Sequence, residues 1–255
     1  MLNNLLAWSF ALVAPLVLLL VVRARNWESL GWSVRSTFWV IAVAALAFSA
    51  IGNGPVQTLA LAGWRMPTLA SLGWGLLAAV CLMLTGGALT FVQRALGLPI
   101  GDKAAFDQIA DKPASLRTFV VLTAGIIEEL LYRGVGIGIG SVVLNSATAA
   151  VVVSVSAFVA AHFRWRPAHL IQVATAALVL SAIFLLTAHD LWACIFAHLL
   201  VDAVGFLIVP FVIEARGRKK VAPALDQPNG SPDVLGQSPK DAIKDSTQTS
   251  PSPRA

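Results

Sequence analysis

The chain has 255 residues, of which 57% are hydrophobic and only 12% are charged, and its mean hydropathy is +0.78. A soluble globular domain carries about 25% charged residues, so this composition argues against a soluble domain and indicates a membrane protein. The net charge of +5 does not indicate nucleic-acid binding, because the basic residues lie in short clusters between apolar runs.

Seven apolar runs follow one another along the chain, and each is close to the roughly 20 residues that a transmembrane helix needs. They cover residues 3–22, 37–54, 69–92, 117–138, 142–163, 168–188 and 190–213. We therefore predict an all-α, polytopic transmembrane bundle of about seven spans, with six to eight as the range. The first run has no Lys or Arg before Arg23, so we interpret it as a retained span rather than a signal peptide.

The positions of the basic residues test this arrangement independently. If the N-terminus lies outside, 16 of the 18 Lys and Arg fall on the inner side, Arg65 falls outside, and Arg133 lies within a span. Cytoplasmic loops of membrane proteins carry such an excess of basic residues. We therefore predict a multi-pass protein of the cell membrane with its N-terminus outside and its C-terminus in the cytoplasm.

The composition changes near residue 220. Residues 221–255 contain no aromatic residue and are rich in Pro, Ser, Asp, Gln and Gly. Such a segment cannot bury enough apolar surface to order itself. We predict a transmembrane domain over residues 1–220 and a disordered cytoplasmic tail over residues 221–255.

Several charged or titratable residues lie within the predicted spans. A charge at the bilayer centre costs about 2.5–3.5 kcal/mol on insertion scales, so such residues usually face a bundle interior or cavity and mark function. The residues concerned are Glu128, Glu129, Arg133, His162, His198 and Asp202.

Helical geometry separates the two adjacent glutamates. Glu129 and Arg133 are four residues apart and share a face, which predicts an ion pair. Glu128 points about 100° away and is left without that partner. We expect Arg133 and Glu129 to serve structure and Glu128 to serve as a general base. The alternative is that all three form a buried network that only holds helices together.

The two histidines lie on later spans. His198 and Asp202 are four residues apart on the seventh run, so they share a face and can reach a common point. His162 closes the fifth run, with Phe158 one turn before it. Two histidines within the membrane, each near an acidic group or a cavity, favour a site over two unrelated core residues.

These residues form three short motifs. Residues 128–133, Glu-Glu-Leu-Leu-Tyr-Arg, resemble the EExxxR motif of the CAAX-protease and bacteriocin-processing family of membrane proteases, also called the Abi family. Residues 158–162 resemble its FxxxH motif, and residues 198–202 resemble its HxxxN or HxxxD motif. The resemblance covers about residues 115–210. Within the family, the chain is similar to the type II CAAX prenyl endopeptidases.

The resemblance implies a role for each residue. Glu128 and His162 would hold and activate the attacking water, and His198 and Asp202 would stabilise the oxyanion. Glu129 and Arg133 would brace the helix of the first motif. Asp202 departs from the Asn of the eukaryotic relatives; since an ionised Asp would repel an oxyanion, it should be protonated or orient His198. Residues 186–190 also differ from the family's usual turn.

We therefore expect an intramembrane endopeptidase that cleaves a membrane-associated, prenylated or leader-peptide substrate. Its partners would be that peptide and the lipid bilayer, without nucleic acid. The family implies a glutamate-activated water and no cofactor. Zinc held by Glu128, His162 and His198 is the alternative, because two histidines and a glutamate suit an open zinc site.

Two alternatives outside this enzyme class stay open. One is a non-catalytic membrane scaffold or bacteriocin self-immunity protein of the same fold. The other is a proton-relaying transporter, which the lack of an internal repeat disfavours.

The depth of the enzyme's site in the membrane follows from the predicted spans. They place His162 near the inner surface and Glu128 about 16 Å from Arg117 along the helix. The site should then lie toward the cytoplasmic leaflet, with the fourth helix tilted or the fifth extended.

Overall fold

The computed structural model describes residues 1–25, 31–98, 109, 111–163 and 167–212, and within these ranges every regular element is helical. The tail predicted over residues 221–255 and the basic residues at 216–220 lie outside the described residues. The helices are α1 (Leu2–Ala24), α2 (Trp32–Asn53), α3 (Pro55–Leu61), α4 (Leu69–Ala95), α6 (Ala114–Leu122), α7 (Gly140–Leu144), α8 (Ala147–Ala161), α9 (Pro167–Leu186) and α10 (Leu191–Ala203), with π-helical segments η1 (Thr123–Glu128), η2 (Leu130–Ile139) and η3 (Val204–Ile208).

Five helices among the described residues are long and apolar enough to cross a membrane: α1, α2, α4, α9, and α10 with its continuation to Val212. Large apolar side chains such as Val43 and Leu84 are exposed on α2 and α4, as expected for surfaces that face lipid. The protein is therefore a multi-pass, all-helical membrane protein over its described part.

The predicted count of seven spans is not confirmed. The run predicted over residues 142–163 forms α8, which has 15 residues and extends only about 22 Å, less than a hydrocarbon core of about 30 Å. The run predicted over residues 117–138 lies in a succession of short α- and π-helical segments that carries buried charges. Neither therefore qualifies as an apolar span by length and composition.

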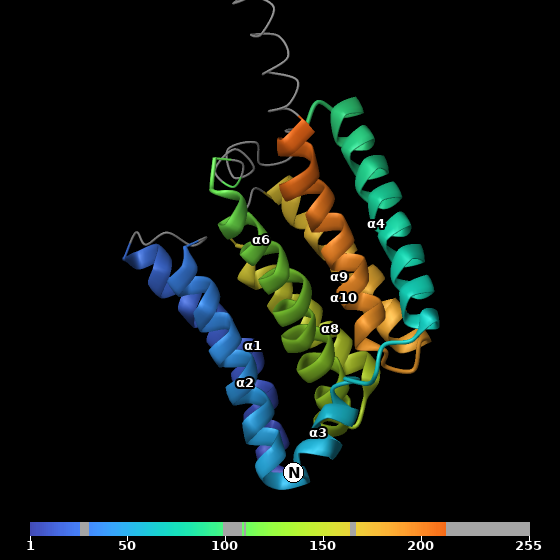
Figure 1. Cartoon of the computed structure of the whole chain (residues 1–255). Helices are drawn as coiled ribbons and strands as arrows, with labels where there is room; N and C mark the ends of the chain where they lie inside the picture. Colours follow the sequence, from blue (N-terminus) through green and yellow to red (C-terminus); the bar gives the residue numbers. More distant parts are fainter. Residues whose placement is uncertain (26–30, 99–108, 110, 164–166, 213–255) are drawn as a thin grey trace, which may run out of the picture. The chain divides into compact units, whose positions relative to one another are not determined.

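The helical segments from Ala114 to Leu144 follow one another directly and carry the first motif (Figure 1). All 10 residues of η2 are buried. In π-helical turns the hydrogen bond spans one residue more than in an α-helix, and such turns are frequent at functional sites. The charged residues of the first motif thus lie on the most enclosed helical stretch of the fold.

Glycines allow other helices to approach η2 closely. A Cβ on Gly138 would collide with the carbonyl oxygen of Leu61 at the end of α3, and one on Gly136 would lie 2.6 Å from the Ser154 hydroxyl of α8. The Ser154 hydroxyl donates to the carbonyl oxygen of Tyr132 at 2.5 Å. Because the Leu61 backbone and the Ser154 side chain occupy the space that added Cβ atoms would need, this packing fixes the position of the motif helix.

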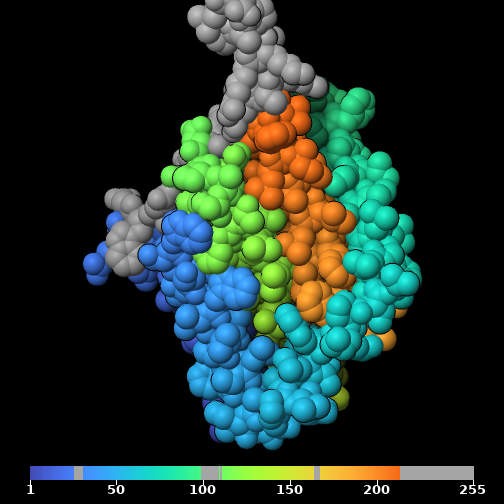
Figure 2. All heavy atoms as spheres, in the orientation of Figure 1, coloured from blue at the N-terminus to red at the C-terminus, as the bar shows by residue number. Residues whose placement is uncertain are grey.

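The helices around this stretch form two packed pairs. α1 packs along α2, and α4 packs along α10. Figure 2 shows α2, the helical stretch after residue 111, α10 and α4 side by side on one face. A hydrogen bond holds the first pair, since the Ser49 hydroxyl of α2 donates to Asn4 Oδ1 of α1 at 2.9 Å. The Thr58 hydroxyl donates to Ser49 Oγ at 3.2 Å and ties α3 to α2. Such bonds stabilise helix contacts in a membrane.

The turn between α9 and α10 is strained and tightly held. Ala188 and His189 have φ values of 50° and 67°, a left-handed conformation that side chains with a Cβ rarely adopt. The guanidinium of Arg65 donates to the carbonyl oxygen of Ala188, and the Leu191 N–H donates to the Gly63 carbonyl at 3.2 Å. Residues 186–190, which differ from the usual turn of the family that the motifs resemble, thus form a turn closed by the segment after α3.

Burial, followed by the nearby charge of Arg65, lowers the pKa of His189 below its ordinary value of 6.5. The neutral ring stacks on Phe184 with the centroids 4.9 Å apart. Asp190 then begins α10, since its Oδ1 accepts from the Trp192 N–H at 3.0 Å and its Oδ2 accepts from the Ser71 hydroxyl at 2.6 Å. These contacts fix the start of the helix that carries the third motif.

Candidate active site

One cavity of about 360 Å³ is lined by the residues that the sequence singled out, with the exception of Glu129. Its lining includes Glu128 from the first motif, His162 from the second, and His198 and Asp202 from the third. These residues come from η1, from the residue that follows α8, and from α10. The fold therefore brings together the four side chains predicted to be catalytic, although they are far apart in the sequence.

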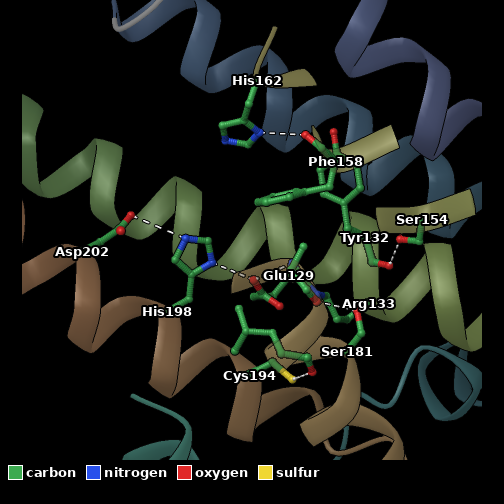
Figure 3. Close-up of polar contacts among 12 residues, drawn as sticks. Glu129, Tyr132, Arg133, Ser154, Phe158, His162, Ser181, Cys194, His198 and Asp202 are labelled. Atoms are coloured by element: carbon green, nitrogen blue, oxygen red, sulfur yellow. Dashed lines mark hydrogen bonds and ion pairs between the residues drawn. The ribbon is translucent and has the colours of Figure 1, made fainter. Parts of the chain in front are cut away.

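Behind the cavity wall, Glu129 is the centre of a buried network (Figure 3). Arg133 Nη1 donates to Glu129 Oε1 at 2.9 Å, and the side chains of Arg133 and Glu129 are 1% and 0% exposed. Arg133 Nη2 also donates to the carbonyl oxygen of Ala177 on α9 at 3.2 Å. The predicted ion pair is confirmed, and it also ties the first motif to a second helix.

His198 joins the same network, which the sequence did not predict. Its Nδ1 donates to Glu129 Oε1 at 2.6 Å, and its Nε2 lies 3.6 Å from Asp202 Oδ2. Since a carboxylate only accepts, Glu129 places a proton on Nδ1 and fixes the orientation of the ring. The His198–Asp202 distance is longer than a hydrogen bond. The expected closeness of His198 and Asp202 is confirmed.

His162 is oriented by its own helix. Its Nδ1 donates to the carbonyl oxygen of Phe158 at 2.7 Å, and its ring packs on the Phe158 ring with centroids 4.5 Å apart. Because a carbonyl only accepts, the neutral ring keeps its lone pair on Nε2. The side chain therefore offers a hydrogen-bond acceptor in a cavity that also contains Glu128.

Among the described residues Glu128 has no ion pair with Arg133, as expected, but it has a charged partner that the sequence did not predict. Arg35 Nη1 lies 3.7 Å from Glu128 Oε1, and the two side chains are 14% and 11% exposed. The sequence interpretation placed Arg35 in a loop before a span starting at residue 37, whereas α2 begins at Trp32 and contains it. The only sequence signal was a basic residue at the edge of an apolar run. The contact itself joins segments 93 residues apart and could not be predicted.

The zinc alternative does not fit these side chains. No group of three His, Cys, Asp or Glu within the described ranges is placed to hold a metal ion. Of the proposed ligands, His198 has one nitrogen committed to Glu129 and the other facing Asp202, and Glu128 is paired with Arg35. A zinc site needs its donors at about 2.0–2.3 Å from one point, and this set does not converge in that way.

The fold and the cavity thus define a polytopic helical membrane protein with an internal site of glutamate, histidine and aspartate. Residues 111–204 match the family model described as type II CAAX prenyl endopeptidase Rce1-like. The match contains all three motifs and confirms the resemblance drawn from them. Because that family is one of endopeptidases, the match implies protease activity. Neither the curated proteins nor the solved structures give a match to this chain.

Proposed function

We propose that the protein is an intramembrane endopeptidase that hydrolyses a peptide bond with a water activated by Glu128. The observation that carries this proposal is the convergence of Glu128, His162, His198 and Asp202 on one cavity. A family match to endopeptidases over the segment that supplies all four side chains supports the same reaction class.

In the proposed first step, a water lies between the Glu128 carboxylate and Nε2 of His162. Glu128 takes a proton from the water while the water oxygen attacks the carbonyl carbon of the substrate. The electron pair of the carbonyl double bond moves to its oxygen and gives a tetrahedral oxyanion. Both groups line the cavity, and the lone pair on His162 Nε2 gives the second water hydrogen an acceptor.

The oxyanion in this proposal is stabilised by His198. With a proton on Nε2 as well as on Nδ1, the ring donates to the oxyanion while Glu129 and Asp202 balance its charge. The distance of 3.6 Å between His198 Nε2 and Asp202 Oδ2 supports an orienting role for Asp202 rather than direct contact with the oxyanion. The intermediate then collapses: the C–N bond breaks, and Glu128 passes its proton to the leaving nitrogen.

The remaining parts of the proposal are the substrate, the orientation and the cofactor. The substrate would be a membrane-associated peptide, such as a prenylated chain end or a leader peptide. The N-terminus would lie outside and the C-terminus in the cytoplasm, in line with the distribution of basic residues. No metal takes part in the proposed mechanism.

The test is cleavage of a panel of fluorogenic peptides, prenylated and unmodified, by the purified full chain in detergent. Wild type is compared with Glu128→Ala and with Asp111→Ala, which removes an exposed carboxylate that does not line the cavity. We expect Glu128→Ala to lose at least about 10³-fold in kcat/KM, within the range of general-base effects. Asp111→Ala should match wild type.

A chelator separates the two chemical alternatives in the same assay. Activity that survives the chelator supports the glutamate mechanism, whereas activity that the chelator removes and zinc restores would favour the metal enzyme. Equal cleavage by wild type and Glu128→Ala would refute the assignment of Glu128. Failure of wild type to cleave any peptide would favour the non-catalytic scaffold.

A further inference from the structure

Arg35 reaches the cavity from a part of the chain that the family match does not cover. It lies in the first turn of α2, whereas the match begins at residue 111. Its side chain is 14% exposed and contributes to the cavity lining beside Glu128. A guanidinium enclosed in a membrane protein is costly unless a partner or a function retains it.

The contacts of Arg35 differ from those of Arg133. Arg133 donates to a carboxylate at 2.9 Å and to a backbone carbonyl at 3.2 Å. Arg35 instead approaches Glu128 at 3.7 Å through one nitrogen, lies 5.8 Å from the centre of the Phe38 ring, and has a buried Nε without a hydrogen-bond partner. Charge-assisted bonds that lock a geometry are shorter, about 2.7–2.9 Å. Within the part of the chain that the structure describes, Arg35 is therefore held near Glu128 without a hydrogen bond to another acceptor.

In the described part of the chain, the other charged residues around the cavity are paired with one another, so Arg35 is the counter-charge available to Glu128. Glu129 is already neutralised by Arg133, and His198 lies between Glu129 and Asp202. Glu128 has its ion pair with Arg35 and lacks one to Arg133 or His198 among the described residues. An ionised carboxylate in a site of low dielectric needs such a counter-charge, because an unpaired buried charge is strongly unfavourable.

We propose that Arg35 is a positioning residue of the active site: through one oxygen it holds the ionised Glu128 carboxylate in place and leaves the second oxygen to accept from the attacking water. This inference rests on the proposed function of Glu128. A contact through a single oxygen suits the task, since a bidentate pair would occupy both oxygens of the carboxylate. The helix pair α1 and α2 would then contribute a side chain to the active site, in addition to facing the lipid.

The first test measures kcat and KM for Arg35→Gln, Arg35→Lys and Arg94→Gln on a peptide that wild type cleaves. Arg94 is the matched control, because it is an exposed arginine on α4 that does not line the cavity. We expect Arg35→Gln to lower kcat about 10²-fold with KM changed less than about threefold, since the loss falls on the chemical step. Arg35→Lys keeps the charge, so its kcat should be at least about tenfold higher than that of Arg35→Gln. Arg94→Gln should behave as wild type.

The second test is a double-mutant cycle of Arg35→Gln with Glu128→Gln, measured by activity and by thermal unfolding. We expect the double variant to be no less active than Glu128→Gln alone, and its shift in Tm to be smaller than the sum of the two single shifts. The inference is overturned if Arg35→Gln keeps the wild-type kcat, or if Arg35→Lys folds but has a kcat no higher than that of Arg35→Gln. It is also overturned if the effects of the two substitutions are additive both in activity and in Tm.

The two levels of the proposal fail in different ways. If Glu128→Gln is inactive while Arg35→Gln is fully active, the role of Arg35 falls and the proposed function stands. If Glu128→Gln is as active as wild type, the proposed function falls and the role of Arg35 falls with it. If wild type cleaves no peptide, coupling in thermal unfolding still decides the pairing, and additive shifts there overturn the inference.

Discussion

Glu128 and Glu129 are adjacent in the sequence but lie in two different regions of the molecule. Glu129 is fully buried and contacts Arg133 at 2.9 Å and His198 at 2.6 Å. Glu128 lines the cavity, and its ion pair with Arg35 has a separation of 3.7 Å. Successive side chains point in different directions around a helix, so one glutamate faces the neighbouring helices and the other faces the open space.

The difference teaches how one motif supplies both structure and chemistry. Glu129 does not line the cavity and contacts Arg133 and His198 through Oε1 alone, so we expect it to hold helices and to orient His198. The looser pairing of Glu128 leaves acceptor capacity toward the cavity. Variants that disturb one region and spare the other test this division.

The largest expected effect on stability comes from breaking the buried network. Arg133→Met removes the cation and leaves Glu129 charged and buried, which should cost about 3–5 kcal/mol of unfolding free energy. Arg94→Met, at an exposed position, should change the stability little. Thermal unfolding of both variants in detergent provides the comparison. If Arg133→Met unfolded at the wild-type temperature, the network would not be the structural region that we describe.

A smaller effect is expected from the packing that positions both glutamates. A Cβ on Gly138 would collide with backbone of Leu61, so Gly138→Ala must displace η2 or α3 and should cost about 1–3 kcal/mol. Gly73 on α4 has no atom within 4 Å of an added Cβ, so Gly73→Ala should be neutral or slightly stabilising. Because η2 carries Arg133 and directly follows Glu128 and Glu129, Gly138→Ala should also lower cleavage. A stable and fully active Gly138→Ala protein would contradict this packing.

The smallest effect is expected in the turn between α9 and α10, away from both glutamates. Ala188 has a φ of 50°, which glycine adopts without strain, so Ala188→Gly should stabilise the fold by up to about 1 kcal/mol and leave cleavage unchanged. Ala182→Gly in the interior of α9 is the matched control and should destabilise by about 0.5–1 kcal/mol. The same sign of change in both variants would show that backbone strain at Ala188 is not important.

The sequence predicted the apolar spans that depend on length and hydropathy alone. The runs predicted at 3–22, 69–92, 168–188 and 190–213 lie within a few residues of Leu2–Ala24, Leu69–Ala95, Pro167–Leu186 and Leu191–Val212. The spacing of four residues between Glu129 and Arg133 also sufficed for their ion pair, because a helix brings such positions together.

The sequence did not predict contacts that depend on tertiary packing. Arg35 was assigned to a loop because a hydropathy window ends an apolar run at a charge, although the helix continues through it. The bond between His198 and Glu129 joins residues 69 apart and follows only from the packing of α10. The π-helical turns were also not predicted, since α- and π-helices share the same apolar pattern over a few turns.

The most direct test of the division between the two glutamates measures kcat/KM and thermal unfolding side by side for Glu128→Gln and Glu129→Gln. We predict that Glu128→Gln loses at least about 10³-fold in cleavage with a smaller loss of stability. Glu129→Gln should show the larger fall in unfolding temperature, because it weakens a buried ion pair and the bond to His198. Wild-type cleavage by Glu128→Gln, or equal losses of stability in the two variants, would contradict the division.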